Sequence, residues 1–218
     1  MDLRAILFDM DGVLVDSMKY HMKSWKELLD TYHIKLSEEF IYEHEGAMDY
    51  EVIGNIFSQK GILLEPGQIE EIYITQNRLF NEKYIFMVTF YPEALPLLER
   101  LVAQGLRLGL VTSSRMNLVN QIWKGETSKF FRAVITSDHT ERFKPYPDPY
   151  LKALQEVGGE GPNTLVIENA PAGIQSALAA GLTCYAISST LPREKLSLAH
   201  RIFPDLNALS RYLEGLIC

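Results

Sequence analysis

The chain contains little cysteine and no excess of basic residues. Its two cysteines among 218 residues, Cys184 and Cys218, provide no disulfide framework, which is typical of a protein of the reducing cytoplasm. We expect Cys184, which lies in an apolar run, to be a buried strand residue. Lysine and arginine number 21 against 28 aspartates and glutamates, so the formal net charge is -7, which argues against a nucleic-acid-binding protein. An anionic substrate therefore needs locally placed cations, because the overall field repels it.

Long hydrophobic runs, repeats and low-complexity tracts are also missing from the sequence. No segment approaches the ~20 apolar residues that a membrane span needs. The first residues, MDLRAILFDMDG, carry acids inside their apolar stretch, so we expect no signal peptide. We expect a cytoplasmic protein without membrane or nucleic-acid partners, as a monomer or alternatively a dimer. A chain of 218 residues can form one good core and a smaller accessory domain.

The first third of the chain has a helical hydrophobic pattern. Met18, Met22, Trp25, Leu28 and Leu29 recur at steps of three and four residues, as on one face of a helix. No convincing strand occurs between residues 17 and 88. The pattern predicts helices over residues 18–29, 37–45, 49–60 and 66–88.

From Tyr91 onward, short apolar strands alternate with helices of about ten residues, which is typical of βαβ units and a parallel sheet. The predicted strands are residues 3–8, 106–112, 133–136, 164–168 and 183–187. The predicted helices between and after them are residues 92–104, 115–124, 147–157, 171–180 and 205–216. We therefore expect an α/β protein: a Rossmann-like, doubly wound parallel sheet formed by residues 1–15 and 89–218. An all-helical cap of residues 16–88 is inserted after the first strand.

Two carboxylates follow the first apolar strand. Asp9 and Asp11 are two residues apart, so both side chains project to the same side of an extended chain. At ~4 Å and an effective dielectric constant of about 20, two such charges repel by roughly 4 kcal/mol. A bound cation or a shared proton must offset this repulsion. Gly12 then permits a sharp turn.

The string DMDGVLVDS, residues 9–17, resembles the first motif of the haloacid dehalogenase superfamily, in the branch of small phosphatases and phosphoglucomutases. The resemblance implies that Asp9 is the nucleophile that accepts the phosphoryl group. It also implies that Asp11 is the general acid and base, and that its backbone carbonyl is a metal ligand.

Two later segments add hydroxyl groups and a cation. Thr112, Ser113 and Ser114 follow the apolar run LGLV, where small hydroxyl residues and free backbone N–H groups can bind an anion. Their place resembles the second motif of the family, which implies that they bind the phosphoryl oxygens. Lys144 opens KPYPDPY, which resembles the third motif, whose lysine ties the nucleophile to the phosphate. Three prolines hold that lysine in place.

The fourth resemblance concerns the metal. Glu168 and Asn169 end an apolar strand before an Ala-rich helix, where the family has acidic magnesium ligands, often with aspartate in the second position. The resemblance implies a Mg²⁺ site formed by Asp9, Asp11, Glu168 and Asn169. An amide oxygen can bind Mg²⁺ but adds no negative charge. Either Asn169 binds through that oxygen or Glu168 binds directly.

The helical insert bears on the substrate. His21 and Trp25 match an HxxxW-like pattern of the family, and His21 could lie near Asp11 or be an ordinary helix-face histidine. Gly46 lies where the family has a cap loop that reaches over the site, so the resemblance implies that it helps to bind the substrate. Related phosphoglucomutases have a phosphate-binding arginine three residues later, where this chain has Asp49. Arg78 and Lys83 could replace it, but a solvated role is the simpler interpretation.

The sequence thus predicts a Mg²⁺-dependent phosphatase that hydrolyses a small phosphorylated metabolite through an aspartyl-phosphate. The alternative is a β-phosphoglucomutase-type phosphomutase, against which Asp49 argues. A metal-free 2-haloacid dehalogenase typically lacks the second aspartate, so Asp11 argues against it. A non-catalytic sugar-phosphate-binding protein would need a lost nucleophile or metal site, to which only Asn169 points.

Overall fold

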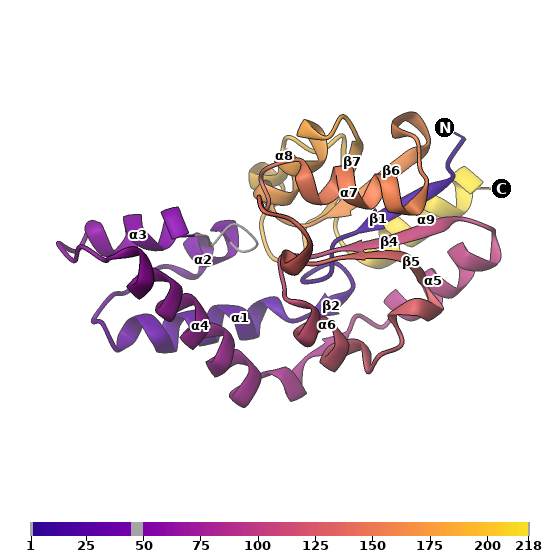
Figure 1. Cartoon of the computed structure of the whole chain (residues 1–218). Helices are drawn as coiled ribbons and strands as arrows, with labels where there is room; N and C mark the ends of the chain where they lie inside the picture. Colours follow the sequence, from indigo (N-terminus) through magenta and orange to yellow (C-terminus); the bar gives the residue numbers. More distant parts are fainter. Residues whose placement is uncertain (1, 45–49, 218) are drawn as a thin grey trace.

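The computed structural model describes residues 2–44 and 50–217, and its centre is a six-stranded, all-parallel sheet (Figure 1). The strand order is β5-β4-β1-β6-β7-β8. The strands are β1 (Ala5–Phe8), β4 (Arg107–Val111), β5 (Phe131–Ile135), β6 (Thr164–Glu168), β7 (Thr183–Ile187) and β8 (Arg201–Phe203). The first strand lies in the middle and the order reverses there, as in a doubly wound sheet. This arrangement confirms the predicted fold class.

Helices cover both faces of the sheet. The helices α5 (Ala94–Ala103), α6 (Met116–Trp123) and α9 (Leu206–Ile217) pack on one face, around Phe8, Leu110 and Ile167. The helices α7 (Asp148–Val157) and α8 (Pro171–Ala179) pack on the other face, around Leu7 and Val166. Because both faces are covered, the central strands are buried throughout and their sequences are continuous apolar runs. Cys184 in β7 is a buried free thiol, as predicted.

The described residues between Ser17 and Val88 contribute four α-helices, which extend to one side of the sheet (Figure 1). They are α1 (Met18–Asp30), α2 (Glu38–His44), α3 (Tyr50–Ser58) and α4 (Pro66–Lys83). They enclose an apolar cluster of their own around Trp25, Ile53 and Phe57. The expected fourth helix was too long, since α4 ends at Lys83 and a 3₁₀ turn, Ile85–Met87, follows it.

Two pairings were not predicted from the sequence. The antiparallel pair β2 (Val15–Asp16) and β3 (Thr89–Phe90) joins the two ends of the helical segment. The strand β8 has only three residues and lies at the sheet edge, so its sequence carries no clear period. Among the described residues, no helix has both the length and the apolar character for crossing a membrane.

Candidate active site

The polar residues predicted from three separate motifs meet at one edge of the sheet. Because β1 lies between β4 and β6, the residues that end these strands are neighbours: Asp9, Thr112 and Glu168. This edge holds the carboxyl ends of parallel strands, where ligands bind in open α/β sheets. A cavity of about 180 Å³ opens there, between the strand ends and the helices α1 and α4.

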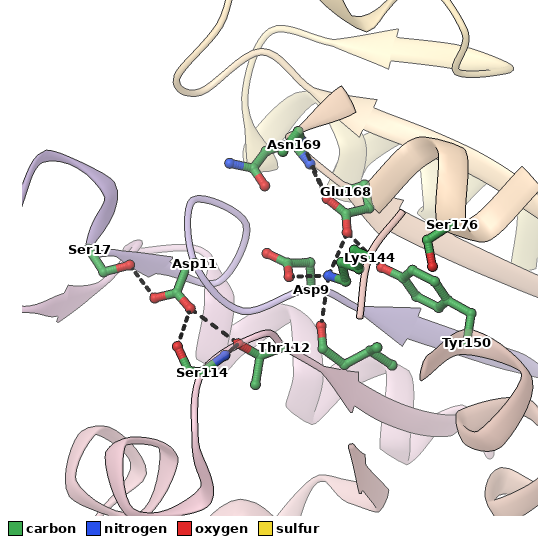
Figure 2. Close-up of polar contacts among 12 residues, drawn as sticks. Asp9, Asp11, Ser17, Thr112, Ser114, Lys144, Tyr150, Glu168, Asn169 and Ser176 are labelled. Carbon is green, nitrogen blue, oxygen red and sulfur yellow. Dashed lines mark hydrogen bonds and ion pairs between the residues drawn. The ribbon is translucent and has the colours of Figure 1, made fainter. Parts of the chain in front are cut away.

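Lys144 joins two of the carboxylates (Figure 2). Its Nζ lies 2.6 Å from Asp9 Oδ1 and 2.7 Å from Glu168 Oε1, and it donates to the carbonyl oxygen of Val111 at 3.1 Å. Burial lowers the pKa of Lys144, but Asp9 and Glu168 outweigh that effect and raise the pKa above its usual value. The amine therefore stays charged and fixed in place between the two acids.

Asp9 has more negative charge around it than Lys144 compensates. Burial raises the pKa of Asp9 well above its usual value, with Lys144 opposing the shift and Glu168 and Asp11 adding to it. Lys144 thus contacts two buried carboxylates, and Asp11 adds a third negative charge that acts on Asp9. Such a site favours a second cation, because an unpaired charge is costly away from water.

The oxygen donors present fit a hard dication such as Mg²⁺. The described residues contain no group of three or more His, Cys, Asp or Glu side chains arranged to hold a metal. Asp9 and Asn169, which both line the cavity, would together with the backbone carbonyl of Asp11 offer three oxygen donors, of which one belongs to a side-chain carboxylate.

Glu168 is surrounded by donors. Oε1 accepts hydrogen bonds from Lys144 Nζ and from the hydroxyl of Tyr150, each at 2.7 Å. Oε2 accepts from the backbone N–H groups of Asn169 at 2.9 Å and Ala170 at 3.4 Å. A carboxylate has about four acceptor positions, so both oxygens are fully used. Tyr150 was not predicted as a site residue, although it ends the quoted KPYPDPY segment.

Asp11 is also held by several donors (Figure 2). Ser17 Oγ donates to Oδ1, whereas Thr112 Oγ1 and Ser114 Oγ donate to Oδ2 at 3.2 and 3.1 Å. Burial raises the pKa of Asp11, but His21 and the hydroxyl donors outweigh it and lower the pKa overall. The structure therefore favours the ionised form of Asp11.

His21 reaches the site from α1. Its Nε2 lies 3.4 Å from Asp11 Oδ1. Of the two interpretations of the sequence, a histidine near Asp11 or an ordinary helix-face histidine, the structure supports the first. The imidazole stacks on Phe80 of α4, with ring centroids 3.9 Å apart and an angle of 8° between the rings. Ser24 and Gln76 tie the same two helices together, through a 2.7 Å hydrogen bond from Gln76 Nε2 to Ser24 Oγ. The position of His21 therefore depends on the packing of α1 against α4.

Comparison with known proteins agrees with this geometry. The family of haloacid dehalogenase-like hydrolases matches residues 6–187, which span all four motifs. The chain belongs to this family. The predicted family is thus confirmed.

Individual relatives are similar to this protein over nearly its whole length. A protein named "Putative pyrophosphatase PpaX" from Caldanaerobacter subterraneus subsp. tengcongensis is 31% identical over 206 residues, which cover 90% of this chain and 87% of that protein. A solved structure titled "Putative beta-phosphoglucomutase from Bacteroides vulgatus" is 32% identical, with a TM-score of 0.86 and coverage of 99% and 89%. A hydrolase from Pseudomonas syringae shares the fold at 24% identity, with a TM-score of 0.87 and coverage of 98% and 99%.

Within this haloacid dehalogenase-like fold, most other predicted residues lie at the cavity. Ser113 and Trp25 line it, and so do residues that were not predicted as site residues: Met18, Tyr73, Gln76, Asn77, Arg115 and Phe143. These come from α1, α4 and loops of the core, and no sequence motif marks them. Gly46 and Asp49 lie outside the described residues. The cations expected to be solvated, Arg78 and Lys83, are exposed.

Proposed function

We propose that this protein is a magnesium-dependent phosphatase that hydrolyses a small phosphomonoester through an aspartyl-phosphate. The observation that supports this most is the position of Lys144, which donates hydrogen bonds to both Asp9 and Glu168. Asp11, with the hydroxyl groups that donate to it, lines the same cavity. A nucleophilic carboxylate, a fixed cation and an acid–base group thus lie at one cavity. Phosphoryl transfer depends mainly on such positioning and charge compensation.

In the proposed first step, Asp9 attacks phosphorus in line. The bond from phosphorus to the leaving oxygen breaks, and Asp11 gives that oxygen a proton. The hydroxyls of Thr112 and Ser114 now donate to Asp11. When they turn to the phosphoryl oxygens instead, Asp11 loses donors that favour its ionised form, so its pKa rises and it can carry the proton.

In the second step, Asp11 takes a proton from a water molecule. That water attacks the phosphorus of the aspartyl-phosphate, the bond from phosphorus to Asp9 breaks, and inorganic phosphate leaves. Lys144 keeps Asp9 oriented in both steps through its 2.6 Å contact. Bound Mg²⁺, held by Asp9, the backbone carbonyl of Asp11, and Asn169 or Glu168, would offset negative charge on the phosphoryl group.

The helical segment, residues 16–88, would be a cap that encloses the leaving group. Side chains of α1 and α4 line the cavity, and among these Trp25 and Met18 are apolar whereas Gln76 and Asn77 carry amides. Such a wall suits a compact polar metabolite. Arg115, an exposed residue next to α6, adds a cation from the core side. We expect the enzyme to act in the cytoplasm.

The test is phosphate release from a panel of phosphorylated metabolites, with and without Mg²⁺. The panel should include sugar phosphates, phosphoglycolate, nucleotides and pyrophosphate, since one relative is named as a pyrophosphatase. We expect Mg²⁺-dependent release from at least one monoester and none from the Asp9→Asn variant, because an amide is a poor nucleophile. Residual activity of that variant within tenfold of wild type would overturn the role of Asp9.

A phosphomutase is the second candidate, because the solved structure at 32% identity is titled "Putative beta-phosphoglucomutase". It would use the same residues but retain a bisphosphate intermediate. Addition of a hexose 1-phosphate with a catalytic amount of the bisphosphate separates the two. We expect inorganic phosphate to appear faster than the hexose 6-phosphate, and the reverse order would establish the mutase.

A further inference from the structure

The side chain of Asn169 is held on one side by two neighbours. It is 1% exposed, and its Nδ2 donates a hydrogen bond to Thr190 Oγ1 at 3.2 Å. A Cβ atom on Gly12 would lie 2.1 Å from the same Nδ2. The amide nitrogen therefore fits into the space that glycine leaves at position 12. Figure 2 shows the amide oxygen on the side of Asp9 and the nitrogen turned away from it.

This orientation matters because the two ends of an amide differ. The carboxylate of aspartate offers a metal either of two equivalent oxygens. An asparagine has one ligating oxygen, and its NH₂ group cannot bind a cation. If the side chain turned by half a rotation, two N–H donors would face the site. An asparagine ligand thus needs a partner that accepts from its nitrogen.

Thr190 can be that partner because its loop is tied to the core at several points. The loop follows β7, and its Ser189 Oγ donates to the backbone carbonyl of Gly12 at 2.6 Å. Ser188 donates to the carbonyl of Phe203 through both its backbone N–H, at 2.9 Å, and its hydroxyl, at 3.2 Å. Thr190 is therefore fixed relative to both Gly12 and Asn169.

The alternative ligand, Glu168, is less available. Its Oε1 accepts from Lys144 and Tyr150, and its Oε2 accepts from two backbone N–H groups. Direct metal binding by Glu168 would break at least one of these bonds. We propose that Thr190 is a positioning residue that keeps the oxygen of Asn169 toward the metal and so makes this asparagine a magnesium ligand. The inference rests on the proposed magnesium dependence.

A double-mutant cycle on Mg²⁺ affinity tests the inference. Mg²⁺ alone is titrated by calorimetry into wild type, Thr190→Val, Asn169→Asp and the double variant. We expect Thr190→Val to weaken Mg²⁺ binding about tenfold or more, as loss of a partner that orients a ligand typically does. In the Asn169→Asp background the same change should weaken Mg²⁺ binding by less than about threefold. Both oxygens of a carboxylate can bind the metal, so the aspartate does not need Thr190 to orient it.

Thr190→Ser is the matched control, since it keeps the accepting hydroxyl and should keep Mg²⁺ affinity. Melting temperatures without metal show whether each variant is folded, and Thr190→Ala replaces Thr190→Val if the latter is not. Equal losses in both backgrounds, or no loss in the wild-type background, would overturn the role of Thr190 while leaving magnesium dependence intact. Failure of wild type to bind Mg²⁺ would instead overturn the proposed cofactor.

Discussion

Gly173 of α8 lies directly against the carboxylate of Glu168. A Cβ atom at position 173 would be 1.8 Å from Glu168 Oε1, far closer than any two such atoms can approach. The backbone of α8 thus passes next to the acid because glycine has no side chain. This contact explains why the helix that follows β6 contains a glycine at a buried position.

We expect Gly173→Ala to displace Glu168, and with it the Lys144 contact, and to lower both melting temperature and activity. Overpacking of this kind typically costs about 1–3 kcal/mol. The matched control is Gly215→Ala in α9, where a Cβ atom would meet nothing within 4 Å. That change should be neutral or stabilise by roughly 0.5–1 kcal/mol, because alanine favours helix. Equal effects of the two changes on melting would contradict the close packing at Gly173.

Asp9→Asn should stabilise the metal-free protein at neutral pH. Burial raises the pKa of Asp9, so the folded-state pKa lies above the unfolded value of about 3.9. Wild type therefore loses stability as pH rises through the folded-state pKa, and the amide does not. We expect the variant to melt roughly 2–4 °C higher near pH 7.5, which for this size corresponds to about 1 kcal/mol, and the difference to shrink toward about pH 4. A variant that melts lower at every pH would disprove this.

Asp11→Asn should slow both chemical steps without loss of Mg²⁺ affinity. General acid–base groups typically contribute about 10²–10⁴-fold, and the predicted ligand at this position is the backbone carbonyl, which the substitution keeps. Steady-state rates and Mg²⁺ titrations of the same preparation test the division of roles. The opposite pattern, weak Mg²⁺ binding with a near-normal saturated rate, would assign the Asp11 side chain to the metal.

His21→Phe should move the pH dependence of the reaction. His21 contributes to the lowered pKa of Asp11. Loss of its nitrogen should raise that pKa, so the limb of the pH–rate profile that Asp11 sets shifts to higher pH. This is the alkaline limb for the first step, in which Asp11 must hold a proton, and the acidic limb for the second step, in which it must be ionised. Phenylalanine can keep a stacked contact with Phe80. The control, Phe80→Leu, removes the ring contact but keeps the imidazole, so it should lower stability with a smaller shift of the limb. An unchanged limb in His21→Phe would remove His21 from the acid–base site.

The local patterns of the chain were enough for its architecture. Apolar runs buried on both faces and helices of regular period predicted the parallel sheet and the helical segment, because burial imposes those periods directly. Elements whose stability comes from distant partners were missed. The strand β8 exists only by pairing with β7, and β2 and β3 pair with each other across the whole helical segment.

The sequence by itself determined which residues could do chemistry at the strand ends: Asp9, Asp11, Thr112, Lys144 and Glu168. Each follows or accompanies a local motif, and parallel strands bring their carboxyl ends to one edge.

Only the tertiary structure decided how these groups are held. Tyr150 on Glu168, Phe80 on His21 and Thr190 on Asn169 are contacts between different helices, strands and loops. Sequence spacing carries no information about such contacts, because they depend on how the helices and loops pack around the sheet. Through charge and hydrogen bonds, that packing sets the pKa values and the orientation of the site.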